Sequence, residues 1–213
     1  MRSSVPIPGN PWPHDMVITI DDPHELVDLL WIRETWNLRP VGEDLPPALS
    51  DKPVSEQAQI ESFDQVAKWQ GAWPSIWDAC VKHQGLLRDE GMFDRLHQTA
   101  GGSAERAELL RTLFGPSWRE EFGAEAFTDQ YDTWSQARFE SESRRRGSRS
   151  VDEEPERVSL SALIAAWRGG LSKIVTIPCR GTYTRVIGRH VLLVTEETRK
   201  DPRRYSEALK QFH

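Results

Sequence analysis

Between residues 159 and 212 the apolar positions change period twice. They first recur every three or four residues, as on one face of a helix, at Leu160, Leu163, Ile164 and Trp167. Three runs rich in β-branched residues follow, at 174–178, 182–187 and 190–195, and each is typical of a strand. The helical period returns after Asp201-Pro202, with Tyr205, Ala208, Leu209 and Phe212 on one side. The pattern predicts a helix, an antiparallel meander of three strands, and a second helix.

Glycine in the turns sets the expected register of this meander. Gly188-Arg189 fits a two-residue hairpin turn, which would place Arg185 opposite Leu192. A tight turn at 179–181 would join the first two strands. One face of the sheet then carries the core residues Val175, Ile177, Cys179, Val186, Val191 and Leu193. The other face carries the polar residues Thr176, Tyr183, Arg185 and His190.

The first 140 residues read as an arm followed by helices. Residues 1–15 are rich in proline and glycine and predict an extended N-terminal arm, while 16–20 is a candidate fourth strand of the sheet. The mainly helical region 16–140 then contains several amphipathic segments, which we expect to pack on the sheet as one layer. The side chains expected in its core are Leu30, Trp31, Phe63, Trp77 and Trp134.

Residues 141–157 are almost wholly polar, and we expect a flexible linker there. A basic block at 144–149 precedes an acidic run at 152–156, so the charges compensate locally and nucleic-acid binding is not favoured. We expect the helix–meander–helix unit at 158–213 to pack with 16–140 as one domain. The predicted fold class is therefore α+β, a mostly helical domain packed on a small antiparallel sheet.

Composition narrows the classes to which the protein can belong. Its formal net charge is −6, which argues against broad binding to nucleic acid or to anionic membranes. No apolar run approaches the roughly 20 residues of a membrane-spanning helix, and residues 1–6 lack the apolar stretch of a signal peptide. Cys80 and Cys179 fit neither a disulfide framework nor a zinc site. We expect a soluble cytoplasmic protein with no metal and no cofactor, and its many Arg, Trp and Pro residues are typical of a high-GC bacterial genome.

The polar sheet face is the candidate ligand-binding site. The planar guanidinium of Arg185 suits a carboxylate or phosphate, and Thr176, Tyr183 and His190 would add hydrogen-bonding groups beside it. In the alternative interpretation, Arg185 pairs with a structural carboxylate such as Glu207 and binds no ligand. Cys179 lies on the opposite face in this register and Cys80 among apolar helix residues, so both are expected to be buried thiols.

No motif in the chain defines a catalytic set, and we find no resemblance to a known family. The leading hypothesis is a non-enzymatic module that binds a protein partner, because proline-rich and charged arms often become ordered on a partner. The alternative is a small enzyme or an anionic-ligand binder that uses Thr176, Tyr183, Arg185 and His190. The sequence leaves open the oligomeric state and whether the protein is an enzyme. A walled cavity over the four side chains would favour the alternative.

Overall fold

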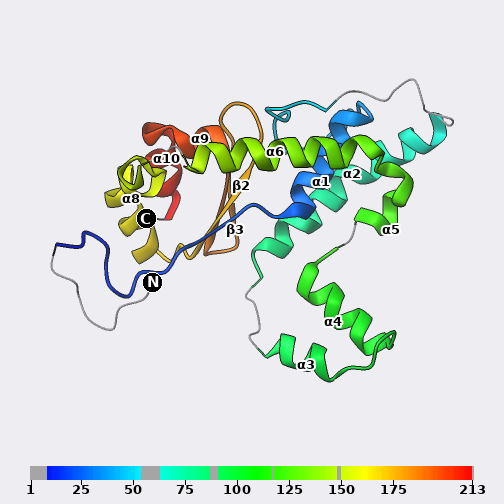
Figure 1. Cartoon of the computed structure of the whole chain (residues 1–213), viewed down its shortest axis with the longest axis horizontal. Helices are drawn as coiled ribbons and strands as arrows, with labels where there is room; N and C mark the ends of the chain where they lie inside the picture. The colour runs from blue at the N-terminus through cyan, green and yellow to red at the C-terminus, as the bar shows by residue number, and fades with distance from the viewer. Residues whose placement is uncertain (1–8, 54–62, 87–90, 117, 148–149, 213) are drawn as a thin grey trace.

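The computed structural model describes residues 9–53, 63–86, 91–116, 118–147 and 150–212 (Figure 1). The strands are β1 Thr19–Asp21, β2 Lys173–Ile177, β3 Thr184–Ile187 and β4 Val191–Thr195. The α-helices are α1 His24–Thr35, α2 Phe63–Gln84, α3 Met92–Gln98, α4 Ala104–Phe114, α5 Trp118–Phe122, α6 Asp129–Gly147, α7 Pro155–Val158, α8 Leu160–Arg168, α9 Glu196–Lys200 and α10 Pro202–Leu209. Short 3-10 turns are η2 Ala124–Ala126, η3 Val151–Glu153 and η4 Lys210–Phe212. The predicted α+β fold class is confirmed.

The sheet is mixed, with the strand order β1-β2-β4-β3. The candidate fourth strand is present as β1, which runs parallel to β2. The expected antiparallel meander is wrong in its pairing, because β2 runs parallel to β4 and only β3 is antiparallel. After β2 the chain pairs with a distant loop instead of turning back: Cys179 forms a bridge with Leu49, and the Arg180 N–H donates to the carbonyl of Ala48. This detour leaves β3 at the edge of the sheet.

The β3–β4 register also differs from the prediction by one residue. The turn comprises Gly188, Arg189 and His190, and Arg185 stands opposite Leu193 instead of Leu192. The turn is fixed from outside, because the carbonyl of His190 accepts hydrogen bonds from the N–H groups of Ser172 and Lys173. A shift of one residue moves every side chain of a strand to the opposite face. The predicted faces of β3 are therefore exchanged.

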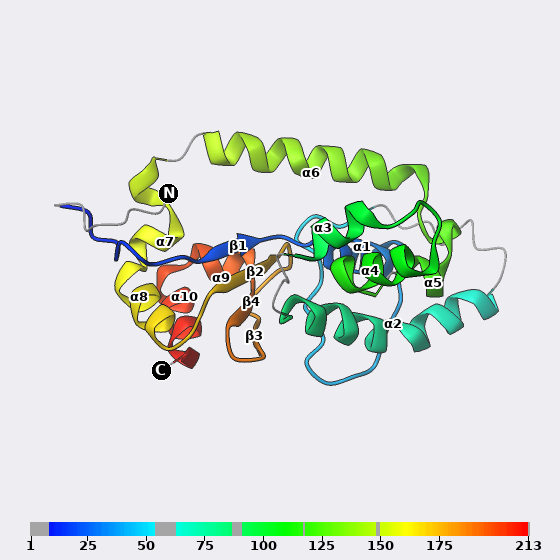
Figure 2. The ribbon, with the colours of Figure 1, turned by 90° about the horizontal axis from the view of Figure 1, so that it is seen from below.

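Both faces of the sheet are covered by helices. Val175, Val191 and Leu193 face one core, which contains α1 and α2. Ile174, Leu192 and Val194 face a second core, built with α8 and α10. In Figure 2 the two groups of helices lie at opposite sides of the strands. A strand that is covered on both faces typically has apolar residues at consecutive positions, and the sequence of Val191–Thr195 has this pattern.

The predicted core residues are found largely where they were expected. Leu30, Trp31 and Trp77 are buried, and Trp134 is partly buried against the same core. The side chain of Phe63 falls outside those that the structure describes. None of the helices within the described ranges combines the length and apolar character that a bilayer span requires.

Polar groups on and around α1 fix the loops that pack against it. Arg33 is 8% exposed and donates to the carbonyls of Pro46 and Pro47 at 2.7 and 2.6 Å. The indole N–H of Trp36 donates to the carbonyl of Ala126 at 2.8 Å, and that of Trp73 to the carbonyl of Leu29 at 2.8 Å. Each bond satisfies a buried donor and joins segments far apart in sequence.

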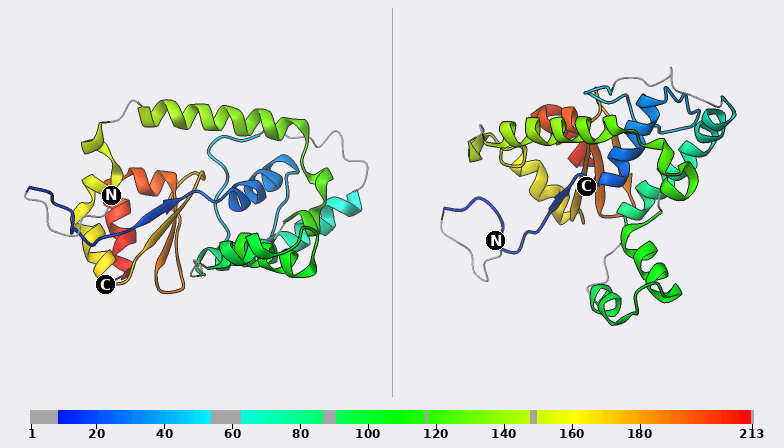
Figure 3. Two further views of the ribbon diagram at one scale, coloured as in Figure 1. Left: turned by 60° about the horizontal axis from the view of Figure 1, so that its bottom comes forward. Right: turned by 45° about the vertical axis from the view of Figure 1, so that its right-hand side comes forward.

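The expected flexible linker at 141–157 contains regular structure. Helix α6 continues to Gly147, and α7 follows at Pro155–Val158, with residues 148–149 outside the described part. Glu156 is 9% exposed and accepts two hydrogen bonds from Arg199, at 2.8 and 2.7 Å, and one from the Tyr205 hydroxyl at 3.1 Å. The partners of Glu156 lie more than 40 residues away, so local composition does not reveal them. Figure 3 shows α6 crossing from the helical half of the molecule to the sheet half.

Two glycines provide a matched test of the packing between α8 and the C-terminal turn η4. A Cβ at Gly169 would overlap the carbonyl oxygen of Phe212, whereas no described atom lies within 4 Å of a Cβ at Gly71, which is exposed in α2. We expect Gly169→Ala to lower the free energy of unfolding by about 1–3 kcal/mol. Gly71→Ala should raise it by up to about 1 kcal/mol, because alanine loses less backbone entropy in a helix. Urea unfolding of both variants measures these changes, and a neutral Gly169→Ala would contradict the close approach of α8 and the C-terminal turn.

Candidate functional site

The structure does not bring the four predicted site residues together. Tyr183 and Arg185 share the face that packs towards α2, and Thr176 points to the opposite face, where its hydroxyl donates to the carbonyl of Asp21 at 3.3 Å. His190 sits in the β3–β4 turn. The reason is the register, since the shift of one residue separates Thr176 from Tyr183 and Arg185.

The polar groups of Tyr183 and Arg185 are engaged within the protein. The guanidinium of Arg185 lies 2.7 Å from Asp78 of α2, and the Tyr183 hydroxyl donates to the carbonyl of Asp44 at 2.7 Å. A structural carboxylate does pair with Arg185, but it is Asp78 and not Glu207, which instead lies 2.8 Å from Lys210. These contacts tie the edge strand to α2 and to the loop before it.

Both thiols are buried, as expected. Cys80 is 2% exposed and Cys179 is fully buried. Burial raises the pKa of each thiol to about 12, so both stay protonated at neutral pH. A protonated, inaccessible thiol is a poor nucleophile. Their arrangement supports packing and no covalent chemistry.

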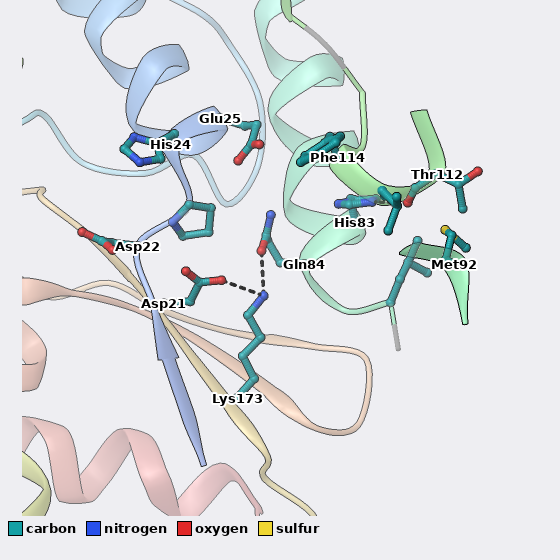
Figure 4. Close-up of a pocket in the computed structure, with 13 residues that line it drawn as sticks. Asp21, Asp22, His24, Glu25, His83, Gln84, Met92, Thr112, Phe114 and Lys173 are labelled. Atoms are coloured by element: carbon teal, nitrogen blue, oxygen red, sulfur yellow. Dashed lines mark hydrogen bonds and ion pairs between the residues drawn. The ribbon is translucent and has the colours of Figure 1, made fainter. Parts of the chain in front are cut away.

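A cleft of about 330 Å³ opens beside the start of α1 (Figure 4). One wall comes from the end of β1, the first turn of α1 and the start of β2, and the other from the ends of α2 and α4 and the start of α3. The lining residues are Asp21, Asp22, Pro23, His24, Glu25, His83, Gln84, Leu86, Met92, Thr112, Leu113, Phe114 and Lys173. The cleft therefore lies between the body of the protein and the helical hairpin 91–116.

Charged groups on the body side of the cleft are mostly paired. The ammonium of Lys173 lies 3.3 Å from Asp21 and donates to the side-chain oxygen of Gln84 at 2.8 Å. Asp22 lies 3.7 Å from Arg138 of α6. Among the described residues, no hydrogen bond or ion pair holds the carboxylate of Glu25. In Figure 4 this carboxylate points into the space between Gln84 and Phe114. Glu25 is thus the charge that the cleft offers to a ligand.

His83 fastens the hairpin to the body. Its Nε2 lies 3.0 Å from the carbonyl of Thr112, which can only accept, so Nε2 carries the proton. The ring also packs on Gly115, where an added Cβ would lie 2.7 Å from ring atoms. Gly115 has φ of +84°, a conformation that glycine adopts without a steric penalty. His83 and Gly115 therefore set where α4 ends over the cleft.

The hairpin formed by α3 and α4 has no core of its own. Neither helix contains a buried residue, although the structure describes every residue of 91–116. Phe93 is 48% exposed and Phe114 56% exposed, and Leu86 at the hairpin base is 60% exposed. Figure 1 shows the hairpin projecting from the rest of the molecule. Sequence reasoning identified these helices by their apolar spacing but expected them to pack on the sheet.

The described residues contain no group of three or more His, Cys, Asp or Glu side chains arranged to hold a metal ion. No protein-family model matches the chain, and neither curated proteins nor solved structures gave a match. Function must therefore be inferred from the cleft and the hairpin themselves.

Asp78 provides a pH test of the structural role of Arg185. Hydrogen bonds from Lys82 and Arg185 hold the pKa of Asp78 below its ordinary value. Such a carboxylate stabilises the fold above the pKa of the unfolded chain, and this contribution is lost as pH falls through the lowered folded pKa. We expect Asp78→Asn to cost at most about 1 kcal/mol at pH 6 and nothing at acid pH, because the site is partly exposed.

Urea unfolding of wild type and Asp78→Asn across this pH range measures the difference. Asp44→Asn, at an exposed loop side chain, is the matched control. A stability difference that does not shrink on acidification would show that Asp78 acts through something other than its charge.

Proposed function

We propose that this protein is a cytoplasmic protein-binding module that docks its partner on the α3–α4 hairpin and the adjoining cleft. One observation carries the proposal: α3 and α4, described over their full length, contain no buried side chain while Phe93 and Phe114 are about half exposed. Both side chains belong to the same projecting hairpin, and exposed apolar side chains on such an element are candidates for contact with a partner.

Helix energetics support the same interpretation. The two helices have 7 and 11 residues, and isolated helices shorter than about 12–15 residues are marginal in water. The hairpin is held at its base by His83 and internally by the Arg106 side chain, which donates to the carbonyl of Leu96 at 2.8 Å. A partner that covers its apolar side would supply the burial that these helices lack.

The sequence-based alternative, an enzyme or binder of anions at the sheet face, has less support. Asp78 already neutralises Arg185, and Thr176 lies on the other face of the sheet. The proposed location in the cytoplasm is supported by the two free cysteines, Cys80 and Cys179, since secreted proteins usually oxidise theirs.

Replacing the two exposed phenylalanines tests the docking surface. We expect Phe93→Asp combined with Phe114→Asp to weaken partner capture at least about tenfold, because charge at an apolar contact must be desolvated. Tagged wild type and variant are used to capture proteins from cells that produce the protein natively, with identification by mass spectrometry.

Phe139→Asp is the matched control, since Phe139 is 66% exposed on α6 and does not line the cleft. Circular dichroism checks that all three proteins are folded. A partner retained by the folded double variant would refute the hairpin as the docking surface.

A further inference from the structure

Building on the proposed function, we propose that the cleft binds a basic amphipathic segment of the partner. A Lys or Arg side chain of that segment pairs with Glu25, and its apolar side chains pack on the hairpin wall. Two independent features of the cleft point to this chemistry: the charge of one wall and the apolar character of the other.

The body wall is acidic. Its lining includes three carboxylates, Asp21, Asp22 and Glu25, against one ammonium, Lys173. The charge of Lys173 is compensated by Asp21, and that of Asp22 by Arg138 nearby. The carboxylate of Glu25 is the remaining negative charge on this wall. Glu25 lies in the first turn of α1, at the edge of the cleft. A cationic side chain is the group that this wall attracts.

The hairpin wall is apolar and carries no net charge. The cleft residues on this side include Leu86, Met92, Leu113 and Phe114, with Leu86 and Phe114 strongly exposed. Within 91–116 the acids Asp94, Glu105 and Glu108 balance the bases Arg95, Arg106 and Arg111, three against three. The preference for a cation therefore comes from the body wall, while the hairpin supplies apolar contact and the long stem of a Lys or Arg can lie along it.

The acidic body wall and the apolar hairpin wall together favour a basic amphipathic segment over other possible occupants of the cleft. A second copy of the chain would bring a hairpin whose three arginines are balanced by three acids, on a protein of net charge −6. It therefore offers Glu25 no net positive charge and adds like-charge repulsion. Nucleic acid is repelled by the same charge. A small polyamine would satisfy Glu25 but leave the apolar wall uncovered. A segment that presents cations beside apolar side chains matches both walls at once.

Model peptides test the proposal without knowledge of the partner. A peptide of about 18 residues, long enough to form a helix on binding, carries leucine at helical spacing and lysine elsewhere. Matched peptides replace every lysine by glutamate or by glutamine, and spermine is tested alongside. Fluorescence anisotropy at low and physiological salt should show binding of the lysine peptide alone, weakening as salt rises.

Point variants locate the binding. Glu25→Gln should weaken the lysine peptide about fivefold, the upper range for a partly exposed ion pair. Phe114→Ser should weaken it about tenfold through lost apolar contact. Glu43→Gln and Phe139→Ser, at exposed positions outside the cleft lining, should leave binding unchanged. Equal losses of affinity for Glu25→Gln and Glu43→Gln would show that only general surface charge matters, and would overturn the proposal. Equal binding of the glutamine or glutamate peptide would also overturn it, as would binding of spermine alone.

Failure of this inference is distinguishable from failure of the proposed function. If capture of the native partner depends on Phe93 and Phe114 but is unchanged by Glu25→Gln, the hairpin is the docking surface. The proposal that the bound segment is basic is then wrong. Sedimentation over rising protein concentration should show a monomer throughout. If wild type forms a dimer and the double variant Phe93→Asp with Phe114→Asp is monomeric, the occupant of the cleft is a second copy of the chain. That result would overturn the proposal of a basic partner segment.

Discussion

The burial of helix α1 is the constraint on which the rest of the structure depends. Leu26, Leu29, Leu30, Trp31 and Ile32 are all fully buried, so apolar side chains leave the helix on nearly every side. Such a helix is stable only when other elements surround it. The sheet, α2, the loop 40–53 and the segment 118–134 all do so, and together they form the larger of the two cores.

Polar contacts then hold those surrounding elements in place. Asp28 of α1 accepts hydrogen bonds from the Trp118 indole and the Tyr131 hydroxyl, which fixes α5 and α6 on the same helix. Desolvation is the main reason that the pKa of Asp28 is raised, and the two donors oppose it. Because α1 is held so tightly, its first turn presents Glu25 to the cleft from a rigid element. The opposite wall belongs to the hairpin, which His83 fastens at its base. The cleft thus has one charged wall on a buried helix and one apolar wall on a projecting hairpin.

Local patterns predicted many of the elements, though not their partners. The Asp-Pro start of α10, the apolar face of α8 and the short strand β1 follow from spacing and capping over a few residues. The pairing of Cys179 with Leu49 and of Glu156 with Arg199 joins segments that local patterns treat separately. The first contact leads the chain away from β2 before β3 begins, and the second holds α7 against α9.

For the candidate site, too, the local sequence indicated residue types but not which residues lie beside them. Arg185 pairs with a structural carboxylate, as the alternative interpretation held, but in the observed register that carboxylate is Asp78 of α2 and not Glu207. The cleft escaped sequence reasoning because its walls come from four separate stretches, around residues 21–25, 83–86, 92–114 and 173. Apolar spacing in 91–116 shows that the hairpin has an apolar side, while only the tertiary structure shows that nothing among the described residues buries it.

Hydrogen–deuterium exchange of the protein alone tests the central claim most directly. Amides of α3 and α4 should exchange far faster than those of α1, β2 and β4, because the hairpin buries no side chain within the described structure and can open locally at little cost. Hairpin protection equal to that of α1 would contradict the account, since it would mean that this surface is already covered in the free protein.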